Sequence, residues 1–176
     1  MAAKNAPVVV LEELPRKRFG EYLSIFEEAK RTGTLGTVLP PKSIKQMELW
    51  AKHGTVFFLI RNNSDFNHPK TGQKIHANEL VGACGISKSL FRKNVAIIIN
   101  QFIISEYRGA NFAKPMLRAQ EAYAKSKGAK KGIAFLQYRD KAQKTRYREE
   151  GWGWGHAPSI GHAFKGRYSR KVRKRL

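Results

Sequence analysis

The chain has 176 residues, of which 34 are Lys or Arg and 13 are Asp or Glu, so its formal net charge is +21. This length suits one domain of ordinary size, and a 41% share of hydrophobic residues, with ten Phe and three Trp, supplies a core and excludes a chain disordered throughout. So positive a protein attracts polyanions and repels other cations, although its charge says nothing about the fold.

The first third of the chain predicts one short strand and two helices. Residues 7–11 (PVVVL) are apolar and mostly β-branched, which favours a strand. Over residues 15–30 the apolar positions recur at helical spacing with charges between them, and Thr32-Gly33 ends that helix. A second helix is expected over residues 41–53, after a pair of prolines and before a glycine.

The middle of the chain changes to strands. Residues 55–62 (TVFFLIRN) are β-branched and aromatic, and residues 63–72 have the composition of a turn. Residues 74–87 are expected to form the return strand. The strongest strand is 93–105, whose run of five apolar residues indicates burial on both faces and a central place in the sheet.

Helical spacing returns in the last part. A helix is expected over 112–128, followed by an apolar strand over 131–138 and a short polar helix over 140–151. This order of elements predicts an α/β fold with a mixed sheet and flanking helices. From Lys165 to the end, seven of twelve residues are Lys or Arg. The expected division is therefore a single domain over 1–164 and a basic C-terminal tail over 165–176.

The turn between strand 93–105 and helix 112–128 has the features of an anion site. A tight turn that begins a helix exposes several backbone N–H groups, and the helix N-terminus adds partial positive charge. Gly109, Ala110 and Ala113 are small enough for close backbone approach, and Arg108 adds a formal charge. The alternative from the residues alone is an ordinary solvent-exposed turn.

Two motifs in this part of the chain resemble the GCN5-related N-acetyltransferase (GNAT) family over about residues 55–152. The family carries Q/R-x-x-G-x-G/A at the start of its central helix, where this chain has Arg108, Gly109, Ala110, Asn111, Phe112 and Ala113. It also carries Tyr-x-x-x-Gly-Phe near the end of its fold, where this chain has Tyr147 to Trp152 (YREEGW). Asn111 stands where the family most often has a glycine.

The resemblance implies acetyl-CoA as cofactor and a place for each of its parts. The family binds it in a V-shaped opening, here between strands 93–105 and 131–138. The amides of Arg108 through Ala113 are expected to bind the pyrophosphate, and the backbone of Phe102, Ile103 and Ile104 to pair with the pantetheine arm. Tyr147 is expected to protonate the leaving thiolate. Strand 93–105 offers no acid for the base, so Glu79 is the nearest alternative. From the residues alone, Tyr147 could equally cover the sheet edge.

The remaining positive charge predicts a polyanionic partner: DNA, RNA or a ribonucleoprotein. Cations and aromatic residues interleave near the C-terminus, a mixture that suits nucleic acid, whereas the alternative is a solvated face and a solubility tail. The expected nucleic-acid contacts are Arg139, Lys141, Lys144, Arg146, Arg148, Trp154, Arg167, Arg170, Lys171, Arg173, Lys174 and Arg175.

Two functions follow as expectations. The first is an acetyl-CoA-dependent N-acetyltransferase that acts on an amine of a macromolecular, nucleic-acid-associated acceptor. The alternative is a catalytically decayed GNAT-fold protein that serves as a nucleic-acid-binding or structural component of a phage particle, virion or ribonucleoprotein. The sequence predicts no metal site, since Cys84 is the single cysteine and the histidines lack ligand spacing. Its apolar runs are too short to span a membrane, so we expect a cytoplasmic protein, or alternatively one within a virus particle.

Overall fold

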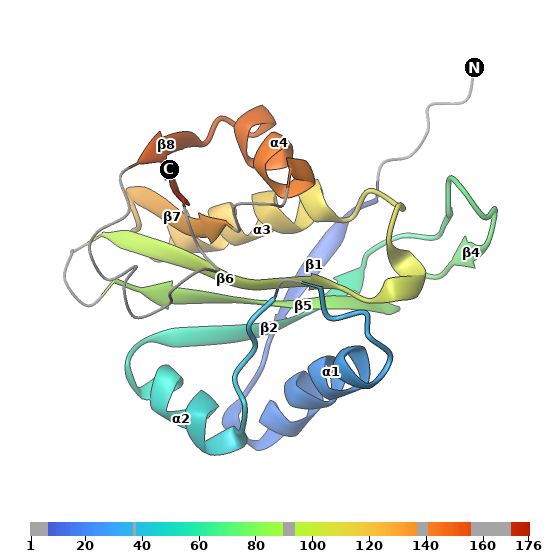
Figure 1. Ribbon diagram of the computed structural model, residues 1–176, viewed down its shortest axis with the longest axis horizontal. Helices are drawn as coiled ribbons and strands as arrows, with labels where there is room; N and C mark the ends of the chain where they lie inside the picture. The colour runs from blue at the N-terminus through green and yellow to red at the C-terminus, as the bar shows by residue number, and fades with distance from the viewer. Residues whose placement is uncertain (1–6, 37, 90–93, 137–140, 156–169) are drawn as a thin grey trace.

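The computed structural model describes residues 7–36, 38–89, 94–136, 141–155 and 170–176. Its centre is a sheet of seven strands (Figure 1). Their order across the sheet is β1 (Val9–Glu13), β2 (Thr55–Asn62), β5 (Leu80–Lys88), β6 (Val95–Ile103), β7 (Lys131–Leu136), β9 (Arg170–Arg175) and β8 (Gly153–Gly155). The α/β fold with a mixed sheet, expected from the order of elements, is confirmed.

Helices cover both faces of this sheet (Figure 1). On one face lie α1 (Phe19–Arg31) and α2 (Ile44–Lys52), and on the other α3 (Ala113–Ser126) and α4 (Lys141–Glu149). Short 3-10 turns precede α1 and α3, η1 (Arg16–Arg18) and η2 (Ser105–Tyr107). A separate hairpin of β3 (Phe66–Asn67) and β4 (Lys74–Ile75) projects at the end of the sheet.

The parallel pair β6 and β7 determines where a site can form. All other neighbouring strands of the sheet are antiparallel, whereas β6 and β7 are joined by the crossover through α3. A parallel pair requires such a long connection. The carboxyl end of β6 therefore leads directly into the turn that begins α3.

Each face of the sheet has its own hydrophobic core. The stripe of α1 that carries Tyr22 and Phe26 packs with Phe57 of β2 and Phe102 of β6. The opposite core gathers Phe58 with buried residues of α3 and α4, and it includes Cys84, whose thiol pKa burial raises. Because both faces are covered, the central strands are continuously apolar, as the sequence of 93–105 indicated.

The C-terminal segment corrects one expectation. Residues 165–176 were predicted to be a tail beyond the fold, but Arg170–Arg175 forms β9, which pairs with β7 on one side and β8 on the other. Because almost all residues of β9 are cations, it lacks the alternation of apolar and polar residues by which a strand is normally predicted. The charge of Lys174 is neutralised by an ion pair with Glu121 of α3, whose N–O distance is 2.8 Å. The division at residue 164 stays a prediction, because residues 156–169 lie outside the described part.

Within the described ranges, no helix is both long and apolar enough to cross a bilayer. The same part of the chain contains no group of three or more His, Cys, Asp or Glu side chains that could hold a metal ion.

Candidate active site

Strands β6 and β7 stay paired for only part of their length. The ladder runs from Val95 and Lys131 to Ile98 and Ala134, while β6 continues to Ile103. Beyond Ile98, no described strand pairs with this edge of β6, and Figure 1 shows β7 beside one end of it. The second half of β6 thus has an unpaired edge, which can accept a ligand as an added strand.

A β-bulge marks the point where the edge becomes free. Gly85 of β5 lies opposite Ile99 and Ala83 lies opposite Phe102, so one residue of β5 faces both Asn100 and Gln101. Asn100 adopts the left-handed backbone conformation with φ 52°, which a small polar side chain tolerates. The bulge changes the alternation of side chains and turns Gln101 toward α3, where it bonds Gln120.

Only one residue of the expected pantetheine segment presents its backbone to that free edge. The amide of Ile104 donates to the carbonyl of Val81 of β5 at 3.0 Å, and the carbonyl of Ile104 accepts from the amide of Tyr107 at 3.0 Å. Phe102 is paired with Ala83 of β5. Because antiparallel residues alternate between facing their partner and facing away, the N–H and C=O of Ile103 point away from β5. The expectation for Phe102 and Ile104 is therefore corrected: the backbone of Phe102 faces β5, and both backbone groups of Ile104 are bonded within the protein.

The turn after β6 has the backbone that an anion site needs. Gly109 and Asn111 have φ values of 91° and 66°, so Asn111 takes the conformation for which a glycine would be preferred. Ala110 and Phe112 are both 1% exposed, and the Phe112 ring packs against Phe66 with centroids 5.3 Å apart. The Phe112 side chain is thus part of the core.

Some amides of this turn are used and others are free. Those of Arg108 and Ala110 donate to carbonyls within the turn at 3.2 and 3.3 Å, so they are not available to a ligand. No hydrogen bond joins the amides of Gly109, Asn111, Phe112, Ala113 or Lys114 to a described residue. Five unpaired donors at a helix N-terminus fit a diphosphate. The residues present therefore fit acetyl-CoA at this end.

The side chain of Arg108 has a different role from the one expected. Its Nε donates to the carbonyl of Ile103 at 3.1 Å, and its Nη2 donates to the carbonyl of Thr34. The guanidinium also lies 5.3 Å from the centre of the Phe102 ring. Arg108 thus lies across the free edge of β6 and binds the one carbonyl that faces the opening, rather than adding its charge beside the turn amides.

Tyr147 of α4 belongs to a buried chain of hydrogen bonds. It is 1% exposed, and its hydroxyl donates to Oε1 of Gln101 at 2.7 Å. Gln101 donates to Oε1 of Gln120 at 2.7 Å, and Gln120 donates to the carbonyl of Gly85 at 3.0 Å. The chain connects α4, the bulge of β6, α3 and β5 through neutral groups, so it fixes the Tyr147 hydroxyl beside the bulge.

Burial raises the pKa of Tyr147 well above the ordinary value for a phenol. Loss of its proton would leave an anion in a low-dielectric region, which the protein disfavours. The ring of Trp152 lies edge-on at 5.0 Å and closes one side. At neutral pH Tyr147 is consequently a proton donor and not a base.

Solved structures resemble this arrangement along nearly the whole chain. A GNAT acetyltransferase from Staphylococcus aureus Mu50 matches with a TM-score of 0.66 and 14% identity over 96% of this chain and 99% of its own. IAA acetyltransferase from Bacillus cereus matches with a TM-score of 0.63 and 14% identity over 96% of this chain and 99% of its own. A dodecameric structure of spermidine N-acetyltransferase from Vibrio cholerae matches with a TM-score of 0.63 and 15% identity over 94% of this chain and 91% of its own. No family model and no curated protein sequence matches.

This chain has the fold of the GNAT acetyltransferases. At such low identity the likeness establishes the arrangement of strands and helices, and the chemistry must come from the residues themselves. The sequence resemblance had already indicated the segments that form this site. They supply the free edge of β6, the unpaired amides before α3 and the hydroxyl of Tyr147.

Glu79, the expected base, lies elsewhere in the fold. Its two carboxylate oxygens accept from the amide of His76 and from the hydroxyl of Tyr107, both at 3.0 Å. These bonds hold the loop before β5 against η2, at the end of the sheet where the turn lies. Neither partner belongs to the chain of hydrogen bonds around Tyr147, so the structure does not bring the two expected catalytic side chains together.

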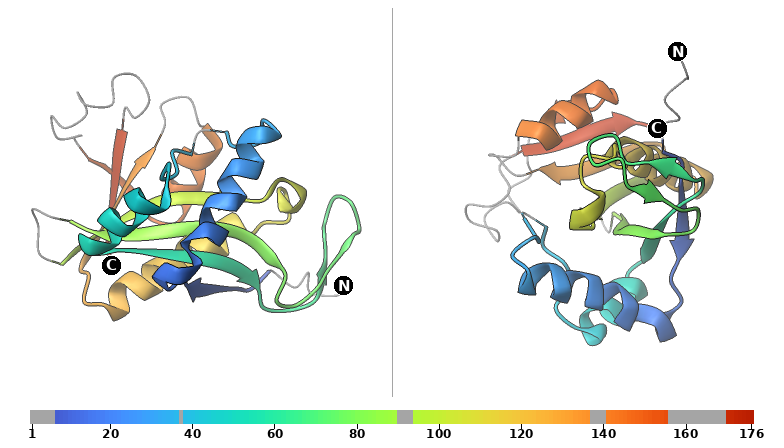
Figure 2. Two further views of the ribbon diagram at one scale, coloured as in Figure 1. Left: turned by 90° about the horizontal axis from the view of Figure 1, so that it is seen from below. Right: turned by 90° about the vertical axis from the view of Figure 1, so that its right-hand side faces the viewer.

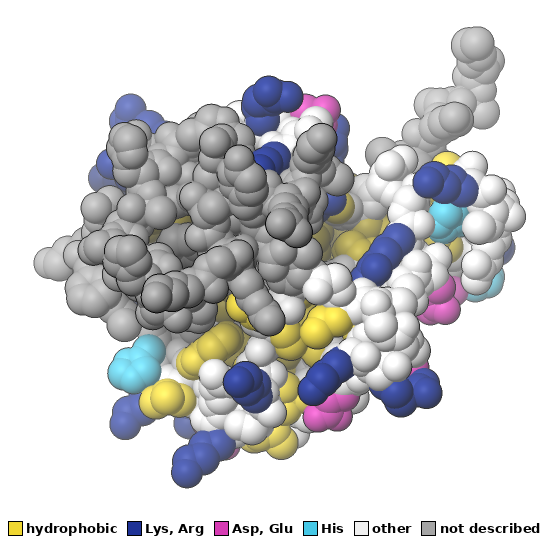
Figure 3. All heavy atoms as spheres, in the orientation of Figure 1, with side chains coloured by type: hydrophobic (Ala, Val, Ile, Leu, Met, Phe, Trp, Pro, Cys, Tyr) yellow, Lys and Arg dark blue, Asp and Glu magenta, His cyan; other side chains and the backbone are white. Residues whose placement is uncertain are grey.

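The expected nucleic-acid contacts are distributed unevenly. Arg148 and Arg175 are exposed, and Lys144 and Arg146 are half-buried. Lys174 bonds Glu121 and the carbonyl of Glu150, so its charge is used within the fold. Arg139 and Arg167 lie outside the described residues; for Lys141, Trp154, Arg170, Lys171 and Arg173 only the backbone is described. On the face in Figure 3, the described cations are spread out rather than gathered in one patch.

Sequence reasoning missed two groups of side chains at this site. Gln101 and Gln120 were not singled out, although a glutamine among the apolar positions of a helix that covers a sheet is a usable signal. His68 and Lys70 lie in the segment taken as a plain turn, and only the fold brings them to Arg108 and Gly109.

Proposed function

We propose that this protein is an acetyl-CoA-dependent N-acetyltransferase. The observation that carries the proposal is the free edge of β6 beside its bulge, with the Tyr147 hydroxyl hydrogen-bonded to Gln101 of that bulge. A free strand edge can form hydrogen bonds with the extended pantetheine arm of the cofactor. A protonated phenol near the middle of that edge can donate a proton to the leaving thiolate. The unpaired amides of the turn at the end of the same strand would take the phosphates.

The reaction exchanges one acyl bond for another. When bound, acetyl-CoA supplies an acetyl group activated as a thioester. The amine nitrogen forms the new bond to the acetyl carbon, the carbon–sulfur bond breaks, the amine loses one proton and the departing sulfur gains one. Tyr147 supplies the proton to the sulfur, and Gln101 keeps the hydroxyl in place. Arg108 must leave the carbonyl of Ile103 for the arm to pair there.

The acceptor amine has to arrive neutral or lose its proton to water. No carboxylate lies on β6, and Glu79 is held by His76 and Tyr107 away from the Tyr147 chain of hydrogen bonds. We therefore leave Glu79 out of the proposed proton transfers. The rate is then expected to rise with pH as the acceptor amine loses its proton.

The charge of the chain supports a polyanionic acceptor. Two of the similar structures carry the names of enzymes for small molecules, spermidine and IAA. A net charge of +21 would repel a polyamine, whereas it would attract an amine carried on a nucleic acid or ribonucleoprotein. We propose that the acceptor is such an amine on an acidic macromolecule.

One observation favours a second candidate function. The Arg108 guanidinium lies on the carbonyl that the pantetheine arm would need. If that contact is permanent, the fold remains without its cofactor, and the basic protein serves as a polyanion-binding or structural component. Acetyl-CoA binding by wild type and by Arg108→Ala separates the two candidates. The second candidate predicts that wild type fails to bind and that the variant, whose Ile103 carbonyl is free, gains binding, whereas the first predicts that wild type already binds.

The test measures binding and turnover separately. Calorimetry with acetyl-CoA should give a saturable binding heat, and thiol release in the presence of RNA-linked and protein-linked amines should identify the acceptor class. Tyr147→Phe should bind acetyl-CoA normally but lose roughly 10²–10⁴-fold in turnover, the usual contribution of a positioned acid. Absence of binding heat with folded wild-type protein would remove the enzyme proposal.

A further inference from the structure

The β3–β4 hairpin is packed onto the turn that precedes α3. Phe66 of β3 contacts Phe112 edge-on at 5.3 Å, and the imidazole Nε2 of His68 lies 3.2 Å from the carbonyl oxygen of Arg108. Figure 2 shows the hairpin, coloured green, beside the yellow turn. Segments about 40 residues apart in sequence thereby form one end of the candidate site.

His68 is the fixed point of this contact. It is 3% exposed, and its Nδ1 lies 3.2 and 3.3 Å from the backbone amides of Lys70 and Thr71. Because both amides are donors, Nδ1 accepts and the ring proton is on Nε2, which donates to the carbonyl of Arg108. A buried histidine with both nitrogens bonded holds the hairpin loop in one position against the turn.

This position places Lys70 along Gly109. A methyl group added at Gly109 would come within 3.2 Å of Cδ, 3.3 Å of Cε and 3.5 Å of Nζ of Lys70. The absence of a side chain at Gly109 thus makes room for the lysine, beside amides that have no bond within the described residues.

The ammonium of Lys70 has a free charge. No ion pair joins Lys70 to a described carboxylate, whereas Lys74 of the same hairpin pairs with Asp65 and Lys114 in the first turn of α3 pairs with Glu149. Arg108 is bonded to two carbonyls. Of these four described cations, Lys70 is the one whose side chain has no ion pair or hydrogen bond to a described residue, so it remains for an incoming phosphate.

We propose that Lys70 is the cation that binds the diphosphate of the cofactor, and that His68 is the positioning residue that holds it there. This inference rests on the proposed function. It moves to a hairpin residue the role that the turn's own residues suggested for the charge of the Arg108 side chain. The unpaired amides of the turn and the ammonium of Lys70 would then contact the same diphosphate from two sides. Hydrogen bonds from a charged donor to a phosphate are stronger than those between neutral groups, so the ammonium would add to the binding by the amides.

The experiment compares acetyl-CoA affinity among variants by calorimetry at low and raised salt. Lys70→Ala should weaken binding roughly tenfold, the size of one charge-assisted contact, and the remaining affinity should depend less on salt than that of wild type. Lys70→Arg should recover most of the loss. Lys74→Ala is the matched control, since it removes a positive charge from the same hairpin away from Gly109, and it should bind as wild type does.

Two further probes separate the alternatives. Dephospho-CoA should lose as much affinity as acetyl-CoA when Lys70 is removed; a loss that disappears with dephospho-CoA would assign Lys70 to the 3′-phosphate and overturn the proposal. His68→Ala should weaken binding and the salt dependence together, whereas His68→Gln should restore both by keeping a donor for Arg108. If wild type binds and Lys70→Ala binds equally, the inference fails alone; if wild type does not bind, the proposed function fails with it.

Discussion

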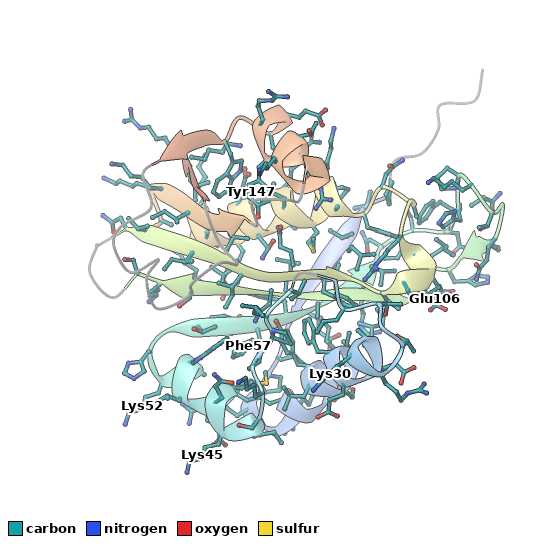
Figure 4. All side chains as sticks on the ribbon, viewed as in Figure 1. Lys30, Lys45, Lys52, Phe57, Glu106 and Tyr147 are labelled. Carbon is teal, nitrogen blue, oxygen red and sulfur yellow. The ribbon has the colours of Figure 1, made fainter. Side chains whose placement is uncertain are left out.

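Both faces of the sheet have a hydrophobic core, but only the core on the α3 and α4 side is crossed by a chain of side-chain hydrogen bonds among the described residues. Figure 4 shows Phe57 on the side of the sheet that α1 and α2 cover, and Tyr147, a residue of α4, on the opposite side. The rings of Phe19, Tyr22 and Trp50 lie around Phe57 with their centroids 5.0–6.3 Å from the centroid of its ring, in edge-on and stacked contacts. Around Tyr147 a line of directed hydrogen bonds runs through Gln101 and Gln120 to β5.

This difference separates stability from chemistry. Apolar contacts add free energy in proportion to buried area and tolerate small shifts. A chain of hydrogen bonds contributes little net free energy but is costly when one partner is left unpaired, and it fixes atoms in place. We therefore expect substitutions on the α1 and α2 face to change the free energy of unfolding, and substitutions on the α3 and α4 face to change turnover first.

The largest expected effect is on the aromatic face. Phe57 is 1% exposed, so Phe57→Ala removes a fully buried ring and leaves a cavity beneath α1 and α2. The free energy of unfolding should fall by about 3–5 kcal/mol in urea denaturation. Phe57→Leu should lose clearly less, because it fills most of the volume. A loss below 1 kcal/mol for Phe57→Ala would show that this face does not carry the stability assigned to it.

The next effect tests the polar face. Gln120 is fully buried, and Gln120→Leu leaves the Gln101 amide and the Gly85 carbonyl unpaired. This should cost about 1–3 kcal/mol of unfolding free energy. Because Gln101 also loses its orientation, turnover should fall while the dissociation constant for acetyl-CoA stays unchanged. Gln73→Leu, at an exposed glutamine, is the control, and equal turnover in both variants would contradict a positioning role.

The sequence predicted the apolar face better than the polar one. The strand over residues 55–62 has the bounds of β2, because burial on both faces leaves a continuous apolar run. The expected return strand over 74–87 is two strands in the structure, β4 and β5, with a turn at Asn78 between them. This turn was missed because its residues were not distinguished from the strand residues around them. The strand β9 was missed because its residues are almost all cations.

The candidate site was predictable where a motif is local and not where contacts are distant. Tyr147 and the turn Arg108–Ala113 were found from short motifs. The orientation of the Arg108 side chain depends on the carbonyl of Thr34, 74 residues earlier, and the place of Lys70 depends on how a hairpin packs. Neither contact leaves a pattern in the neighbouring sequence, so both needed the fold.

The smallest expected effect concerns the ion pairs that fasten α4 to α3. Arg118 donates from Nε and Nη2 to the carboxylate of Glu150 at 2.8 and 3.0 Å, and this contact lowers the pKa of Glu150. Because the guanidinium is largely exposed, Arg118→Ala should lower the free energy of unfolding by only about 0.2–1 kcal/mol at pH 7.

The contribution of this ion pair depends on pH. A carboxyl group whose pKa is lowered on folding stabilises the fold at pH values above its ordinary pKa of 4.5, and it loses that contribution as the pH falls through its pKa in the folded protein. Wild type and variant should therefore differ in denaturant midpoint at neutral pH and converge in acid. A difference that persists where Glu150 is protonated would mean that Arg118 acts by packing its aliphatic stem, with Arg118→Met as the variant that keeps the stem and removes the charge.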